Sequence, residues 1–295
     1  MAIVEAKNTR YRVWLTYLFL ALFIAGMMYP LLAMISISFR TGNLLNGSLI
    51  PDNPSLEHWR LVFGIGSEEE QKWFKNFPVL LWTWNSIKIA FITSAISIVF
   101  SSMAAYAFAR MKFIGSKWLL TSLLIIGLFP ALTGMVAIRI MLEKIGYFIP
   151  ALGFDTHGGL MLLYLSAVLG EIWLIKGYIQ SLDPALEEAA TMDGASRWQT
   201  LRYIVLPLCL PILVVTFILS FIAAFGEYAF ANMMLSDPDK FTLALGMQSF
   251  LNQTYAPLWG DFAATAIFAA LPITLVFLIG QKWLIGGLTS GSVKG

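Results

Sequence analysis

Long apolar runs separated by short polar segments dominate the hydropathy pattern of this 295-residue chain. A helix needs about 20 largely apolar residues to cross the hydrocarbon core of a membrane. Strands of a membrane barrel would be about ten residues long and would alternate in period two, which these runs do not do. We therefore predict a membrane-spanning helix in each of the runs that is long enough, namely 13–37, 85–109, 118–142, 160–179, 206–229 and 262–284.

The composition agrees with a chain that is partly solvated by lipid. Hydrophobic residues make up 58% of it, charged residues only 12%, and the mean hydropathy is +0.76. A water-soluble domain has about a quarter charged residues and about half apolar ones. The predicted fold class is therefore all-α, a polytopic integral membrane protein with six transmembrane helices in a single domain, 1–295.

The basic residues beside the predicted spans set the predicted orientation. With both termini in the cytoplasm, 11 of the 19 basic residues lie in cytoplasmic segments and more than half of the acids lie outside. The first span follows "KNTRYR" and is too long for a secretory signal, so we expect it to stay uncleaved. The long outer segments are then 38–84 and 233–261.

The first outer segment contains "SLEHWRLVFG", which predicts a short helix with Ser55 as its N-cap and Gly64 as its end. Leu56, Trp59 and Phe63 fall on one side of that helix at helical spacing. Two placements fit this pattern, because an apolar side would suit both the membrane surface and a cap over the bundle.

The second outer segment is long for a mere connector. Its polar and aromatic side chains include Asn252, Gln253, Tyr255 and Trp259. They suit hydrogen bonding and ring stacking with a protein partner or a sugar. A loop that only closes the outer end of the bundle fits the same residues.

A polar stretch, "LEEAATMDGASRWQTLRYIVLP" at 186–207, separates the fourth and fifth predicted spans. Asp183 and Pro184 predict the start of a helix and Gly194 predicts its end. Ser196 and Gln199 have capping-box spacing, so a second helix follows. One face of the first helix carries Leu186, Ala189, Ala190 and Asp193.

Small side chains on this helix permit another surface to approach closely, so it fits a cleft in a soluble partner. A loop that shields the end of the bundle is the alternative. A DNA-reading helix-turn-helix has similar spacing, but this segment is tethered between two spans, and the net charge is only +2. We therefore expect no nucleic-acid partner.

The fixed positions of this stretch resemble the EAA loop of permease subunits in bacterial ATP-binding-cassette importers; they are Glu188-Ala189-Ala190, Asp193-Gly194-Ala195, Ile204 and Leu206-Pro207. The resemblance implies a type I importer permease fold in which the cytoplasmic loop, 182–207, carries a coupling helix that docks into an ATPase subunit. The docking residues that it implies are Leu186, Glu187, Glu188, Ala189, Ala190, Met192, Asp193, Gly194 and Ala195.

The likeness extends over most of the chain to the permeases of maltose/maltodextrin importers, through "NSIKIAFITSAISIVFSSMAAYAFARMKF", "SLIPDNPSLEHW" and the terminal "GSVKG". It implies the bacterial cytoplasmic (inner) membrane, a MalF-like second permease, two MalK-like ATPases and an external maltose-binding protein. The companion permease holds most of the sugar in that system, so this chain needs no sugar site of its own. Related permeases carry other oligosaccharides.

The same resemblance assigns partners to two further segments. Gln248, Asn252, Gln253, Tyr255 and Trp259 would contact the binding protein. The tail, 285–295, has no apolar periodicity and is expected to be ordered only by a partner. Its last five residues would enter the ATPase interface; they are Gly291, Ser292, Val293, Lys294 and Gly295.

Two acids, Glu171 and Glu227, lie within or near the ends of predicted spans. A charge in the centre of a bilayer costs a few kcal/mol, so both should face the bundle interior, water or a partner. They are candidates for the transport path or a gate. Satisfied interior acids fit equally well, and proton coupling, as in secondary transporters, is a further alternative.

The sequence carries no constellation that predicts catalysis or a metal site. The G-x-x-x-x-G-K-[ST] phosphate loop is missing, and His58 and His157 have no partners at metal-ligand spacing. The single Cys209 excludes an internal disulfide. We expect a non-catalytic permease whose partner ATPases bind ATP and Mg²⁺. The rival hypotheses are an ion- or proton-coupled secondary sugar transporter and a polytopic membrane enzyme.

Overall fold

The computed structural model describes residues 9–128 and 131–290. Within these ranges the regular structure is helical, apart from an isolated β-bridge between Arg40 and Pro54. The chain forms two compact units. The first comprises Met1–Phe77 and Ser249–Phe268, and the second comprises Pro78–Gln248 and Ala269–Gly295.

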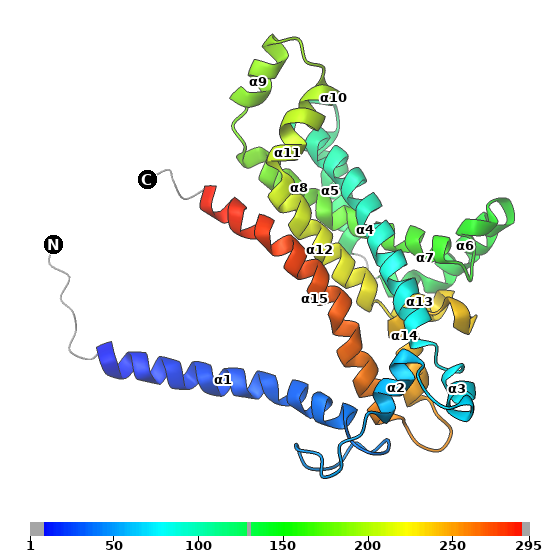
Figure 1. Cartoon of the computed structure of the whole chain (residues 1–295). Coiled ribbons are helices and arrows are strands. Elements are labelled where there is room, and N and C mark those ends of the chain that lie inside the picture. Colours follow the sequence, from blue (N-terminus) through cyan, green and yellow to red (C-terminus); the bar gives the residue numbers. More distant parts are fainter. Residues whose placement is uncertain (1–8, 129–130, 291–295) are drawn as a thin grey trace. The chain divides into compact units, whose positions relative to one another are not determined.

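Among the described residues, four helical stretches are long and apolar enough to cross a membrane, and a bent helix pair would make a fifth (Figure 1). The stretches are α1 (Thr9–Ser38), α4 (Val79–Arg110), the run of α7 (His157–Tyr164), η3 (Leu165–Ala167) and α8 (Val168–Ser181), and α15 (Trp259–Ser290). The bent pair consists of Arg197–Leu208 and Leu210–Gly226, which meet at 75°. The four stretches cover the first, second, fourth and sixth predicted spans, and the bent pair covers the fifth.

The third predicted span, 118–142, stays a prediction. This stretch is divided among α5 (Ser116–Leu128), η1 (Ala131–Gly134) and α6 (Met135–Phe148). Residues 129 and 130 lie outside the described residues, and η1 on their C-terminal side is a 3-10 turn that leads into α6.

In the second unit, α4 packs against both α8 and α12 (Leu210–Gly226), and α8 also contacts α12. The buried face of α4 includes Ala90, Ser94, Ser97, Ser101 and Ala105 at spacings of three and four residues. Small residues at a membrane helix interface let two backbones approach closely. The polar serines of α4 therefore mark its packing face.

A close approach also joins α12 to α15 within this unit. A Cβ placed on Gly280 of α15 would lie 2.5 Å from Cδ1 of Ile218 and 3.1 Å from Cγ1 of Val214. The first distance is shorter than real Cβ contacts, so a side chain at this position would require the end of the Ile218 side chain to move. Glycine lets the two helices pack as they do without that shift.

The segment after α12 folds into α13 (Ala229–Met234), η5 (Pro238–Lys240) and α14 (Leu243–Leu251). Trp82 of α4 donates from Nε1 to the carbonyl of Pro238 at 2.9 Å. Asn85 donates from Nδ2 to the carbonyls of Asp239 and Phe241 at 2.9 and 3.0 Å. These bonds tie η5 to the first turns of α4.

A second set of bonds, here called the strap, joins Asp155 to Ser236 and Lys240 and also holds η5. Oδ1 of Asp155, in the turn before α7, accepts the N–H of Ser236 at 2.8 Å, and its Oδ2 accepts Nζ of Lys240 at 2.8 Å. Burial works to raise the pKa of Asp155. The Lys240 ammonium and the backbone N–H donors outweigh burial and lower the pKa below its ordinary value.

In the first unit, the outer loop leads into α2 (Glu57–Phe63) and α3 (Glu68–Phe74). Gly64 ends α2 with φ +65°, as predicted, but Ser55 is not the N-cap. Leu56 holds that position without a side-chain bond, and Ser55, one residue earlier, accepts the N–H of Glu57 at 3.2 Å. The predicted apolar side is not the buried one. His58, Leu61 and Val62 are buried instead, and Leu56 and Phe63 are exposed.

Candidate functional site

The two predicted helices of the polar stretch are α9 (Ala185–Met192) and α10 (Arg197–Thr200). The turn between them, 193–196, together with the exposed side of α9, is called the corner below. Asp183 accepts the N–H of Ala185 at 3.0 Å, which satisfies one donor at the start of α9. Gly194 adopts φ +85°. The N–H groups of Gly194 and Ala195 donate to the carbonyls of Thr191 and Ala190 at 3.0 and 2.9 Å. This pair of bonds is a Schellman motif, which needs left-handed backbone at the glycine.

The capping box that begins α10 is also present. Ser196 donates its N–H to Oε1 of Gln199 at 2.8 Å and accepts the N–H of Gln199 at 3.4 Å. The helix continues through a turn of π-helix, η4 (Leu201–Val205), into α11 (Leu206–Leu208). Pro207 cannot donate a helical hydrogen bond. This missing bond explains the wider π-helical turn before it and the bend after it.

Arg110, in the last turn of α4, anchors α9. Its Nε donates to Oε1 of Glu187 at 2.6 Å, and one terminal nitrogen donates to the carbonyls of Ile179 and Leu182 at 2.9 Å each. The side chains of Arg110 and Glu187 are only 17% and 14% exposed. A planar guanidinium suits such a fork of contacts, so α9 is fixed to the ends of α4 and α8 (Figure 1).

A hydrophobic cluster lies under the loop. Ile175 and Ile179 of α8 pack with Leu201 and Val205 of η4 and with Cys209. All five side chains are buried. The corner is therefore a firmly supported extension of the second unit, because both an ion pair and an apolar core hold it.

One residue of the predicted docking face is buried in the structure. Ala190 is buried, with 7% of its surface exposed, because it shares the inward face of α9 with Glu187. Met192 is 87% exposed. The other exposed residues expected to dock are Leu186, Glu188, Ala189, Asp193 and Gly194, while Glu187 and Ala195 are partly covered. The free surface of the corner therefore combines apolar, acidic and small side chains.

Glu171 lies in the interface between α8 and α4. Its Oε2 accepts hydrogen bonds from Ser97 and Ser101 at 2.6 and 2.9 Å, and the residue is buried. These bonds satisfy Oε2, whereas Oε1 is buried without a hydrogen-bond partner among the described residues. A role of Glu171 in the transport path stays a prediction.

Glu227 caps α13. Its Oε1 accepts the N–H of Phe230 at 2.9 Å, and its Oε2 accepts the N–H of Ala231 at 3.1 Å. The hydroxyl of Tyr164 donates to the same Oε2 at 2.7 Å. Both carboxylate oxygens are therefore engaged in holding the start of a helix, and a gating role stays a prediction.

The residues expected to reach a binding protein lie on both sides of a unit boundary. Gln248 is part of α14 in the second unit. In the first unit, Asn252 and Tyr255 are exposed, Gln253 donates to the carbonyl of Ser249 at 2.6 Å, and Trp259 begins α15. Tyr255 in particular presents its whole ring to the surroundings.

The predicted tail begins as helix, because α15 continues to Ser290 and so covers 285–290. These residues are helical without an apolar pattern of their own, because adding turns to a helix that has already formed is easier than starting a new one. The five residues expected at an ATPase interface, Gly291 to Gly295, lie outside the described residues.

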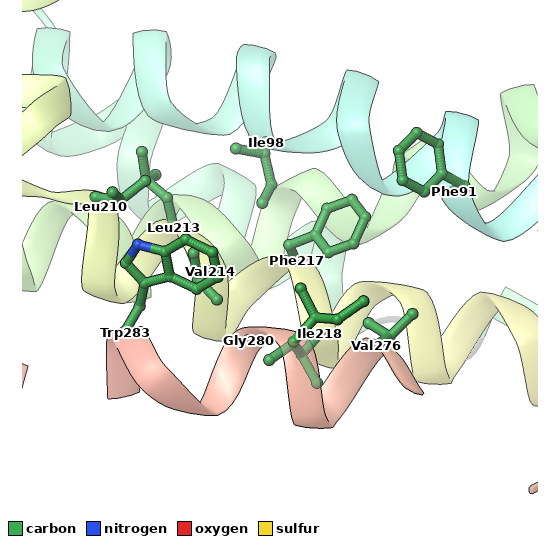
Figure 2. Close-up of a pocket in the computed structure, with 11 residues that line it drawn as sticks. Phe91, Ile98, Leu210, Leu213, Val214, Phe217, Ile218, Val276, Gly280 and Trp283 are labelled. Atoms are coloured by element: carbon green, nitrogen blue, oxygen red, sulfur yellow. The ribbon is translucent and has the colours of Figure 1, made fainter. Parts of the chain in front are cut away.

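An apolar groove of about 430 Å³ lies between α4, α12 and α15 (Figure 2). Sugar hydroxyls would lose their hydrogen bonds to water in such a groove, so it does not suit a sugar. The described residues also contain no group of three or more metal-ligating side chains. The lining residues are Phe91, Ile98, Leu210, Leu213, Val214, Phe217, Ile218, Val276, Ile279, Gly280 and Trp283.

Comparison with known proteins shows which family has this sequence and fold. A family profile described as "Binding-protein-dependent transport system inner membrane component" matches residues 97–289, which include the corner and its anchors. The chain belongs to this family. It is therefore a multi-pass inner-membrane permease of a binding-protein-dependent importer rather than an enzyme.

Relatives that align over the full length show which permeases this chain is similar to. The permease is 50% identical over 298 residues to the maltose/maltodextrin transport system permease protein MalG of Vibrio vulnificus strain YJ016. It is 51% and 49% identical to the proteins of that name from Salmonella typhimurium strain LT2 and Escherichia coli strain K12. Each alignment covers 100% of both chains.

A solved structure shows the same fold. One chain of a bacterial ABC transporter that imports the acidic polysaccharide alginate superposes with a TM-score of 0.74 at 20% identity. The match covers 95% of the permease and 99% of that chain. At this identity the likeness concerns the fold alone.

Sequence reasoning missed Arg110 as part of the site. It counted this residue only as a charge that orients the chain. The available signal was a basic residue at the end of the second predicted span together with an acid-rich loop after the fourth. It could not show the partner, because Glu187 is 77 residues away.

Proposed function

We propose that the permease is a membrane subunit of an ATP-driven importer for maltose and maltodextrins. The observation that carries this proposal is the identity of about half of all residues, over the full length, with three permeases of that name. We place both termini and the corner of α9 and α10 in the cytoplasm. The positive charge beside the predicted spans supports this orientation.

The proposed assembly contains a MalF-like permease, two MalK-like ATPases that bind ATP and Mg²⁺, and an external maltose-binding protein. The exposed corner of α9 would dock into one ATPase. Its small centre at Ala189 and Gly194 suits close approach, and Met192 at its edge is a flexible apolar contact. The segment around Tyr255 would face the binding protein.

The anchoring of α9 supports a mechanical role. If closure of the ATPases displaces α9, Arg110 passes the displacement to the ends of α4 and α8 through its bonds to Glu187, Ile179 and Leu182. The covalent path runs through α10 and η4 to the bend before α12. A π-helical turn beside a bend is a place where a helix changes shape at low cost.

Uptake of labelled maltose into right-side-out membrane vesicles that contain the transporter and are loaded with ATP tests the energy source. Uptake should stop when vanadate is enclosed with the ATP and should persist when a protonophore collapses the proton gradient. The reverse pattern would establish the rival proton-coupled transporter.

A matched pair of variants tests the docking surface. Met192→Asp should abolish co-purification of the ATPase and reduce uptake at least tenfold, because a charge would be buried at the interface. Ile114→Asp places the same charge on another highly exposed apolar residue, in the turn between α4 and α5, and should keep at least half of the uptake. Equal losses in both variants, or retained ATPase binding in Met192→Asp, would contradict docking by α9.

A further inference from the structure

A buried polar cluster joins the outer loop and α2 to the first turn of α15 within the first unit. His58 is 1% exposed, and Asp261 is buried as well. Nδ1 of His58 lies 2.6 Å from Oδ1 of Asp261, and its Nε2 lies 3.2 Å from the carbonyl oxygen of Gly42. Asn43 donates to the other oxygen of Asp261 at 3.2 Å.

The ring of His58 has an acceptor at each nitrogen. A neutral imidazole carries one N–H, so it would point a lone pair at one of these two oxygens. Only the imidazolium, with two N–H donors, satisfies both contacts. The titratable groups that face the ring are Asp261 from α15 and Glu57 from α2, whose Oε1 is 3.5 Å from Nε2. The loop contributes the carbonyl of Gly42 and the amide of Asn43.

The electrostatics agree with this geometry. Burial works to lower the pKa of His58. The hydrogen bond and the charge of Asp261, the charge of Glu57 and the carbonyl of Gly42 outweigh burial and raise the pKa above its ordinary value of 6.5.

Asn43 caps α15 from a distant part of the chain. Its Oδ1 accepts the N–H groups of Gly260 at 2.9 Å and of Asp261 at 3.1 Å. These donors belong to the first turn of α15, where no partner within the helix exists. A Cβ on Gly260 would lie 2.1 Å from Nε2 of His58, so the imidazole packs directly on the helix backbone.

We propose that His58 and Asn43 are positioning residues that fix the first turn of the last membrane helix to the outer loop, and that this joint requires a charged imidazole. The joint stands on its own contacts, whereas its effect on sugar uptake rests on the proposed function. Because the charged form holds the joint, the joint is complete below about pH 6.5 and weakens as the pH rises through the raised pKa of His58.

The charge of His58 is directly measurable, because the chain has only two histidines. We would record nitrogen NMR spectra of the full chain labelled with ¹⁵N-histidine in lipid, and assign the rings with His157→Gln. His58 should show two protonated ring nitrogens at pH 7 and titrate above pH 6.5. A ring that is neutral at pH 7 would overturn the requirement for charge.

Hydrogen exchange tests the positioning. His58→Gln should speed exchange of the amides of Gly260 and Asp261 by about 10- to 100-fold, as expected for loss of a charged hydrogen bond. Asn43→Ala leaves the buried charges in place and should speed the same amides by about tenfold through loss of the cap. His157→Gln, the matched control, should leave them unchanged. Unchanged exchange in both test variants would overturn the proposal.

The two readouts separate this joint from the proposed function. If the joint positions α15 for transport, uptake in wild-type cells should fall at least threefold as the external pH rises through the measured pKa of His58, and His58→Gln should remove that dependence. If the two variants show the predicted faster exchange but the wild type takes up no maltose at any pH, the proposed substrate is rejected and the joint stands. A pH profile that is identical in the wild type and His58→Gln would reject its role in transport.

Discussion

Replacement of Arg110 is the sharpest perturbation of the candidate docking loop. Arg110→Met keeps much of the side-chain length but removes the ion pair with Glu187 and both hydrogen bonds to the carbonyls of Ile179 and Leu182. The carboxylate of Glu187 is then left 14% exposed without its partner. The anchor of α9 on α4 and α8 is lost in a single step.

The size of the effect follows from these contacts. Removing one partner of a fully buried pair costs about 3–5 kcal/mol, but water still reaches part of this pair, so we take about 2 kcal/mol for it. The two carbonyl bonds add about 0.5–1 kcal/mol together after water replaces the guanidinium. A local loss of about 3 kcal/mol corresponds to roughly 100-fold faster opening of α9.

Hydrogen exchange of the α9 amides, measured by mass spectrometry on the assembled transporter, reports this opening. Glu187→Gln is the matched variant, because it removes the charge but keeps an acceptor for Arg110, and it should speed exchange by only about tenfold. The double variant should exchange no faster than Arg110→Met alone, since the shared interaction is already gone. Additive effects of the two substitutions, or unchanged exchange in Arg110→Met, would refute the anchor.

Further predictions concern two glycines and the strap on η5. Gly194→Ala meets open space but must adopt φ +85°, so backbone strain should cost about 1 kcal/mol and speed exchange of the corner about fivefold. Gly246→Ala would place Cβ 2.2 Å from the buried ring of Trp82, so overpacking should cost about 1–3 kcal/mol and lower the melting temperature more than Gly194→Ala does. The lowered pKa of Asp155 means that its bond to Lys240 stabilises the strap above about pH 3.8 and is lost as the pH falls through the lowered value. Proteolysis of 235–241 should therefore accelerate in acid, and Asp155→Asn should be cut quickly at every pH.

The sequence by itself determined the helical class, most of the membrane-capable helices and the corner between α9 and α10. These features depend on local chemistry. A run of apolar residues is enough to predict a span, and the caps at Asp183, Gly194, Ser196 and Gln199 bond to backbone groups within five residues of themselves. The family resemblance rests on the same local pattern of residues, so the amino-acid sequence alone carries it.

Only the tertiary structure decided which side of each helix is buried and which distant residues meet. It showed that Ala190 faces inward, that Arg110 binds Glu187, and that His58 meets Asp261, 203 residues further along the chain. Hydropathy periodicity describes a helix without its neighbours, and in a protein that faces lipid an apolar side is no guide to the packed side. Which polar groups pair in the interior depends on how the helices come together, because a buried donor or acceptor must find its partner wherever the fold brings one within reach.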